Sequence, residues 1–331
     1  MEKNNYEGAL QMPIGSGFNA KSTTSEVVKD INLKGKFVMV TGGNTGIGLE
    51  TVKTLSRVGA TVIVPARDIE KAKKNLQGIA NVEIEEMDLM VPDSINTFAH
   101  KFLASGRPLH VLINNAGIMW VPLRRDNRGY ESQLATNYLA LFQLTARLWP
   151  ALKNANGARL VNVSSGGHQF SDFNFEDPNF MHRNYETLLG YGQSKTAVNL
   201  FSVEFDNRAK AHHVRSYSLC PGAVAETELA REAPLDLFQK LGYSDAEGNI
   251  LPEVAASLKT ISQGAATTVW AATSPLLNQI GGVYCENVDV ASLSSDNSII
   301  GGVKPYSLAE INAKRLWQLS EEMTGLTFDL N

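Results

Sequence analysis

A glycine-rich turn between a short apolar run and an amphipathic segment constrains the fold of this chain most strongly. The run Phe37–Val40 leads into TGGNTGIG at 41–48, and apolar residues then recur at helical spacing. A strand, a turn and a helix in this order present backbone N–H groups to a phosphate, and the glycines allow its close approach. We therefore expect a dinucleotide pyrophosphate here. The predicted binding residues of the turn are Gly42, Asn44, Thr45, Gly46, Ile47 and Gly48.

Strand-like and helix-like segments alternate along most of the chain. We expect strands at 61–64, 82–85, 109–113, 159–163 and 214–219, and helical segments, such as 69–77, between them. This alternation predicts a single α/β domain, a doubly wound Rossmann fold whose central sheet is mostly parallel.

The predicted domain covers residues 32–331, follows an N-terminal extension at 1–31 and ends in a helical segment. Two stretches, 166–190 and 225–260, break the alternation after predicted strands. Loops beyond the carboxyl ends of such strands line the ligand crevice, so we expect both stretches to face substrate.

Composition narrows the classes of function. The net charge is −4 with 19% charged residues, which disfavours nucleic acid as a partner. Only Cys220 and Cys285 occur, and we expect two buried thiols in a reducing compartment. We expect no metal site, no signal peptide and no membrane span, and hence a cytoplasmic protein.

The end of the second predicted strand bears on the choice of cofactor. In NAD-binding units a carboxylate at this point binds the ribose 2′-hydroxyl, whereas here Ala66 is followed by Arg67. A guanidinium pairs with a 2′-phosphate, so we expect NADP(H) to be preferred. NAD(H) stays open as an alternative, because Asp68 could restrain Arg67 or reach the ribose itself.

Tyr191 and Lys195 are candidates for proton transfer. Their i, i+4 spacing places a phenol and an ammonium on one face of a helix that we expect to open at Tyr191. An ammonium at about 4 Å contributes on the order of 4 kcal/mol at an effective dielectric of about 20, which would lower the tyrosine pKa by roughly three units. The alternative is an exposed helix face. Ser164 and Ser165, at the end of a predicted strand, could hold a substrate oxygen.

These motifs, in their order, resemble the short-chain dehydrogenase/reductase family over residues 32–320. The long interval between Ser165 and Tyr191 is similar to the retinol dehydrogenase-like and WW-domain oxidoreductase-like branch. The motifs that carry the resemblance are 41–48, Asp88-Leu89, Asn114–Gly117, Asn137, Ser165, Tyr191 with Lys195, and Pro221-Gly222.

The resemblance implies a role for each matching residue. Tyr191 would be the acid/base, Lys195 would lower its pKa and bind the nicotinamide ribose, Ser165 would position the carbonyl oxygen, and Asn137 would hold a water linking Lys195 to solvent. It also implies a small-molecule substrate and a possible homodimer. The further cofactor contacts that it implies are Asp88, Leu89, Asn115, Ala116, Gly117, Tyr191, Lys195, Pro221, Gly222 and Val224.

The substrate is expected to be an apolar alcohol or its aldehyde or ketone, because apolar side chains crowd both irregular stretches. They could equally form a satellite core that closes the loops. Two other functions stay open: a catalytically silent NADP(H)-binding sensor or scaffold, and a sugar-nucleotide epimerase or dehydratase. In many members of the family a threonine or serine follows the Pro-Gly pair after three residues, whereas here four residues separate Gly222 from Thr227. This departure puts contact of Thr227 with the nicotinamide in doubt. The apolar residues are Phe170, Phe173, Phe175, Phe180, Tyr185, Leu235, Leu237, Phe238 and Leu241.

Overall fold

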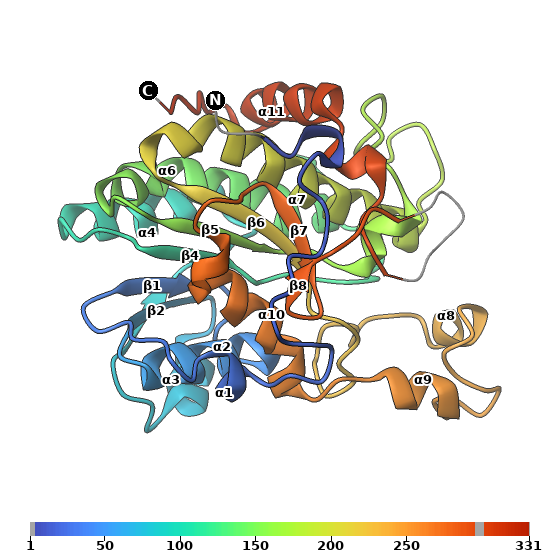
Figure 1. Ribbon diagram of the computed structural model, residues 1–331. Helices are drawn as coiled ribbons and strands as arrows, with labels where there is room; N and C mark the ends of the chain where they lie inside the picture. The colour runs from blue at the N-terminus through green and yellow to red at the C-terminus, as the bar shows by residue number, and fades with distance from the viewer. Residues whose placement is uncertain (1–3, 295–300, 331) are drawn as a thin grey trace.

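The computed structural model describes residues 4–294 and 301–330, apart from the side chain of Leu235. Its centre is an eight-stranded sheet in the order β3-β2-β1-β4-β5-β6-β7-β8, in which only the last pair is antiparallel (Figure 1). The predicted doubly wound, mostly parallel sheet is therefore confirmed. The strands are β1 (Phe37–Val40), β2 (Thr61–Ala66), β3 (Val82–Glu86), β4 (Val111–Asn114), β5 (Arg159–Val163), β6 (Arg215–Cys220), β7 (Val283–Glu286) and β8 (Asp289–Val290).

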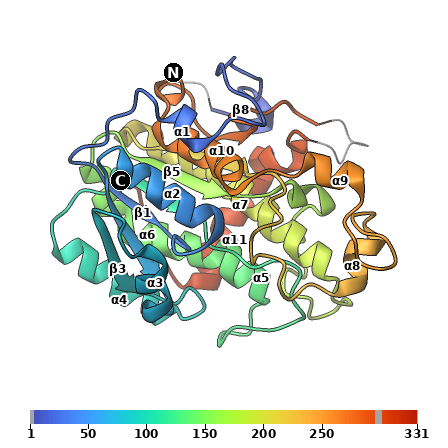
Figure 2. The same cartoon turned by 90° about the horizontal axis from the view of Figure 1, so that it is seen from below.

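Helices cover both faces of the sheet (Figures 1 and 2). One layer holds α4 (Pro92–Ala104), α5 (Ser132–Leu134), η2 (Ala135–Leu139), α6 (Ala140–Asn154), α7 (Thr187–Ala209) and α11 (Glu310–Thr324). The other holds α1 (Thr24–Val27), α2 (Gly46–Arg57), α3 (Ile69–Leu76) and α10 (Ile261–Thr273). The remaining short helices are η1 (Tyr6–Gly8), η3 (Gly166–Phe170), η4 (Lys210–His212), α8 (Leu235–Lys240), α9 (Pro252–Ser257), η5 (Pro275–Leu277) and η6 (Pro305–Leu308).

Successive side chains of one strand enter two different cores. Val38 and Val40 of β1 belong to the cluster under α2 and α10, whereas Met39 belongs to the cluster under α6 and α7. All three are fully buried because both faces of the sheet are covered. This explains why β1 is uniformly apolar in sequence.

The strand order reverses between β1 and β4, because the chain moves outward to β2 and β3 before it returns beside β1. In open α/β sheets the ligand crevice lies at such a switch point, at the carboxyl ends of the strands. The glycine-rich turn follows β1 at this place, which puts the predicted phosphate site at the crevice.

The N-terminal segment packs against the far edge of the sheet. The Gln11 side-chain amide donates to the carbonyl oxygens of Tyr284 (2.7 Å) and Ala291 (2.6 Å), and Asn5 donates to Gly282 O at 2.9 Å. These bonds tie the start of the chain to β7 and β8, which the sequence patterns did not predict. Among the described residues, no helix is both long and apolar enough to cross a membrane.

Candidate active site

Asn137, Ser165, Tyr191 and Lys195 come from three parts of the fold that meet beyond β4 and β5. Asn137 lies on η2, Ser165 follows β5, and the other two lie on α7. Helix α7 begins at Thr187, so the predicted start at Tyr191 was wrong by one turn. Gly190 lies in this first turn, and glycine disfavours a helix in sequence-based reasoning. In the structure a Cβ on Gly190 would lie 3.0 Å from Gln133 Nε2, so the close packing favours glycine.

The helix face that carries the phenol and the ammonium is not exposed to solvent. Tyr191 is 2% and Lys195 is 4% exposed, which rules out the exposed-face alternative. Lys195 Nζ donates to Val163 O at 2.9 Å and lies 5.6 Å from the centroid of the Tyr191 ring. The ammonium is therefore fixed between the end of β5 and the phenol.

Asn137 sits in a π-helical turn, a local irregularity that is common at functional sites. Its amide Nδ2 donates to Ile118 O and to Ser194 Oγ, both at 3.0 Å, while its Oδ1 accepts from Ile118 N at 2.8 Å. The side chain thus joins the segment after β4 to α7. A Cβ on Gly117 would lie 3.1 Å from Asn137 Oδ1 and 3.6 Å from Lys195 Nζ, so Gly117 lies beside the catalytic candidates.

Ser165 links the phenol to the loop after β5. Its Oγ accepts from Gly167 N at 3.0 Å, and its hydrogen bond to Tyr191 favours the ionised phenol and so acts to lower the pKa of that residue. A Cβ on Gly167 would lie 2.5 Å from Tyr191 Cε1, so only glycine fits here without displacing the ring. The loop and the phenol are therefore packed as one unit.

The pKa of Tyr191 beside Lys195 differs from the prediction. Burial raises the pKa of Tyr191 and outweighs the bond from Ser165, whereas the predicted effect of Lys195 was a lower pKa. Burial also lowers the pKa of Lys195 to about 8. The predicted fall is absent because burial removes water from both groups, which disfavours the phenolate of Tyr191 and the ammonium of Lys195 alike.

The glycine-rich turn has the form that a pyrophosphate needs. Gly42 and Gly46 have φ of 64° and 53°, and a Cβ on Gly48 would lie 2.2 Å from Gly42 O. Thr45, the N-cap of α2, makes no side-chain capping bond, so the first N–H groups of this helix remain open to a ligand. The turn therefore fits the phosphates of a dinucleotide.

The segment after β4 is packed tightly against this turn. Asn115 Nδ2 donates to Thr41 O at 2.9 Å, and Thr41 Oγ1 accepts from Ala116 N at 3.0 Å. A Cβ on Gly42 would lie 3.0 Å from Ala116 Cα. These bonds bring the predicted cofactor residues Gly42, Asn115 and Ala116 together at the switch point.

Arg67 and Asp68 follow β2 and are both exposed. The Asp68 carboxylate accepts from Lys71 N at 2.9 Å and caps α3, so its hydrogen bonding is local to that helix. Arg67 makes no ion pair with any side chain in the described ranges, which leaves its guanidinium accessible to an anion. Nearby, the Asp88 carboxylate accepts from Met90 N at 2.9 Å and shapes the turn that carries Leu89.

The segment after β6 reaches the same crevice. Val224 meets Ile47 across Gly264, where a Cβ would lie 2.5 Å from Val224 Cγ2 and 3.1 Å from Ile47 Cγ2. Thr227, whose place the sequence left in doubt, lies with its methyl 3.3 Å from a Cβ on Gly46. It therefore borders the phosphate turn.

Cys220 holds two loops of the site together. It is only half-buried, unlike Cys285, and its Sγ accepts from Gly166 N at 3.2 Å and from Gly222 N at 3.3 Å. The thiol thereby joins the Ser165 loop to the Pro221-Gly222 turn. The sequence indicated only a buried thiol, because the bond from Gly166 N joins residues 54 positions apart in the chain.

His168 joins the Ser165 loop to the segment at Lys304. Its Nδ1 lies 2.7 Å from Ser165 O, and its Nε2 accepts from Lys304 N at 3.2 Å, which places the ring proton on Nδ1. The side chain is fully buried, and burial lowers its pKa to about 4. His168 is accordingly a neutral structural residue.

An apolar wall surrounds the phenol of Tyr191. Of the apolar residues predicted to face substrate, Phe170 is in this wall from the first irregular stretch, and Leu237, Phe238 and Leu241 are in it from the second. Phe173 and Phe175 join the main core, and Phe180 packs on Tyr185 at 5.0 Å. The side chain of Leu235 lies outside the described residues. The wall comprises Trp120, Tyr191, Leu237, Met119, Phe170, Leu188, Ala230, Ala233, Phe238 and Leu241.

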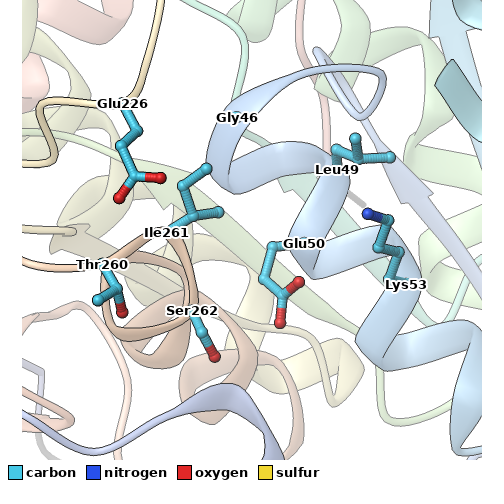
Figure 3. A pocket seen from close by; sticks show the side chains of 8 residues that line it. All are labelled: Gly46, Leu49, Glu50, Lys53, Glu226, Thr260, Ile261 and Ser262. Carbon is cyan, nitrogen blue, oxygen red and sulfur yellow. The ribbon is translucent and has the colours of Figure 1, made fainter.

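A hollow of about 430 Å³ adjoins the phosphate turn on its outer side, between α2 and α10 (Figure 3). Glu50 and Lys53 of α2 line it opposite Glu226, which comes from the loop after β6. Two carboxylates against one ammonium disfavour a phosphate. The charges that line this hollow therefore differ from those expected of a phosphate-binding part of the dinucleotide crevice.

Comparisons with known proteins agree with this geometry. The family model for short chain dehydrogenase matches residues 36–237, and the chain belongs to this family of oxidoreductases with an NAD(P)-binding Rossmann fold. A "Probable oxidoreductase" of Streptomyces lividans is 39% identical over 87% of this chain and 97% of its own. Retinol dehydrogenase 11 of Homo sapiens is 35% identical over 90% of this chain and 89% of its own. A crystal structure of an uncharacterized Mycobacterium Paratuberculosis protein has a TM-score of 0.70 at 31% identity and covers 94% of this chain and 100% of its own.

Proposed function

We propose that this protein is an NADP(H)-dependent oxidoreductase that interconverts an apolar alcohol and its aldehyde or ketone, with Tyr191 as acid/base. The observation that carries the proposal is the buried Tyr191 phenol, bonded to Ser165, packed beside Lys195 and enclosed by an apolar wall. A protein that only binds a dinucleotide needs no phenol and ammonium in such an arrangement.

In the direction of reduction, Tyr191 donates its proton to the carbonyl oxygen. When bound, NADPH supplies the hydride to the carbonyl carbon. Ser165 Oγ accepts from Gly167 N, which leaves its hydroxyl proton for donation, to the Tyr191 phenol oxygen in this structure and to the carbonyl oxygen when substrate is bound. Burial keeps the phenol protonated at neutral pH, which suits a proton donor, and Lys195 provides positive charge as the tyrosinate forms.

Substitution of Tyr191 tests the mechanism. Tyr191→Phe should lower kcat for carbonyl reduction by roughly 10²–10⁴-fold and leave NADPH binding, followed by its fluorescence, unchanged. Tyr217→Phe is the matched control, because Tyr217 is also fully buried but donates to Leu277 O away from the site. Near wild-type turnover in Tyr191→Phe would refute the proposed mechanism. If the wild type binds NADPH but no aldehyde or ketone in the test causes NADPH to be oxidised, a catalytically silent NADP(H)-binding protein is the better proposal.

The preference for NADP(H) rests on the accessible guanidinium of Arg67 and on the local capping role of Asp68. Arg67→Ala should weaken NADPH binding by about tenfold and change NADH binding little, since only NADPH carries the 2′-phosphate. Dissociation constants for both cofactors measure this directly. An unchanged ratio of the two constants would contradict the assignment.

A further inference from the structure

Trp120 has an unusual backbone conformation at the edge of the site. Its φ is 56°, in the left-handed region that bulky side chains rarely adopt. Its N–H donates to Gln133 Oε1 at 2.9 Å, and two residues earlier Ile118 is held by Asn137. Strain that surrounding contacts maintain in this way is typical of functional sites.

The indole lies within the apolar wall. Trp120 is 5% exposed, and it forms one buried cluster with Tyr191 and Leu237. The Phe238 ring of α8 meets it edge-on at 5.4 Å. Trp120 therefore stands beside the catalytic phenol and under α8, where the body of a substrate would lie.

The indole Nε1–H of Trp120 has no acceptor in the described part of the chain. A buried donor without a partner is unfavourable, and at a ligand site it marks a place for an acceptor. Trp149, Trp270 and Trp317 also have unpartnered indole nitrogens, but those side chains belong to the two main cores. Only Trp120 combines the free N–H with the cluster of the catalytic tyrosine.

We propose that the Trp120 N–H donates a hydrogen bond to a second oxygen of the substrate. The substrate would then be an apolar alcohol or carbonyl compound with an additional acceptor, such as an ether or a carbonyl oxygen, apart from the reacting group. This inference rests on the proposed oxidoreductase function. It makes Trp120 a specificity-determining residue that contacts substrate without taking part in proton transfer.

Ketones with a displaced oxygen test this role. The probes are a linear methyl ketone and a series of its analogues in which one methylene at successive positions is replaced by an ether oxygen. With NADPH, the wild type should show kcat/KM about tenfold higher for the analogue whose oxygen meets the indole than for the parent ketone. Trp120→Phe keeps an aromatic ring in the wall and should remove this maximum, so that kcat/KM for that analogue falls to the value which the same variant shows for the parent ketone.

The control variant is Trp317→Phe, which removes an unpartnered indole nitrogen from the main core and should keep the maximum. Calorimetric binding of the same ketones to the NADP⁺-loaded protein should show the same preference without turnover. Equal losses for all ketones in Trp120→Phe, or no maximum in the wild type, would overturn the role of Trp120. Failure of every ketone to oxidise NADPH would instead count against the proposed function.

Discussion

The buried histidine beneath the active-site loop makes stability depend on pH. His168 has a folded-state pKa of about 4, below the ordinary value of 6.5, because burial disfavours the imidazolium. Protonation would also take the Nε2 lone pair that accepts from Lys304 N. Between these two values the unfolded chain binds more protons than the folded one, so stability falls as the pH falls through this window.

The size of the effect follows from the shift. Two and a half pKa units at 1.36 kcal/mol each give about 3 kcal/mol over the whole window, of which about 2 kcal/mol is lost between about pH 7 and about pH 5. His168→Gln removes the titrating group. Near pH 7 the variant should be less stable, because Ser165 O and Lys304 N each lose a partner.

Urea unfolding of the wild type and of His168→Gln at a series of pH values measures this difference. Carboxylates and other histidines are common to both proteins, so their contributions cancel in the comparison. The stability gap between the two proteins should shrink by about 2 kcal/mol from about pH 7 to about pH 5. A constant gap over this range would show that His168 is not held neutral by burial.

Two further predictions concern the proposed catalytic residues Lys195 and Tyr191. Lys195 has a pKa of about 8, so kcat/KM for NADPH should fall above about pH 8 as the ammonium is lost, and this fall should disappear in Lys195→Arg, whose side chain stays charged. The same fall in the arginine variant would assign it to another group. Gly167→Ala should lower kcat by about 10²-fold, because its Cβ would lie 2.5 Å from Tyr191 Cε1, whereas a Cβ on Gly166 meets only Cys220 Sγ at 3.9 Å. Comparable kcat values in Gly167→Ala and Gly166→Ala would contradict this packing argument.

Much of the fold follows from local sequence patterns. The runs Phe37–Val40 and Arg159–Val163, in which apolar residues predominate, match β1 and β5 residue for residue, because strands covered on both faces bury nearly every side chain. The edge pair β7 and β8 was missed. Its strands are short, and the N-terminal segment that covers them comes from the other end of the chain.

The start of α7 and the π-helical turn at Asn137 also escaped local reasoning. Both depend on packing between segments, through Gln133 against Gly190 and through Asn137 against Ile118. Spacing along one helix says that Tyr191 and Lys195 share a face, but it does not say what covers that face.

The glycine turn, the alternation of strands and helices, and the order of the motifs are all readable from the printed sequence, because they depend on residues close together in the chain. Packing between distant segments dehydrates Tyr191 and raises its pKa, ties the Ser165 loop to Cys220 and His168, and places Trp120 in one buried cluster with Tyr191. Burial and hydrogen bonds between distant segments arise only when the layers pack.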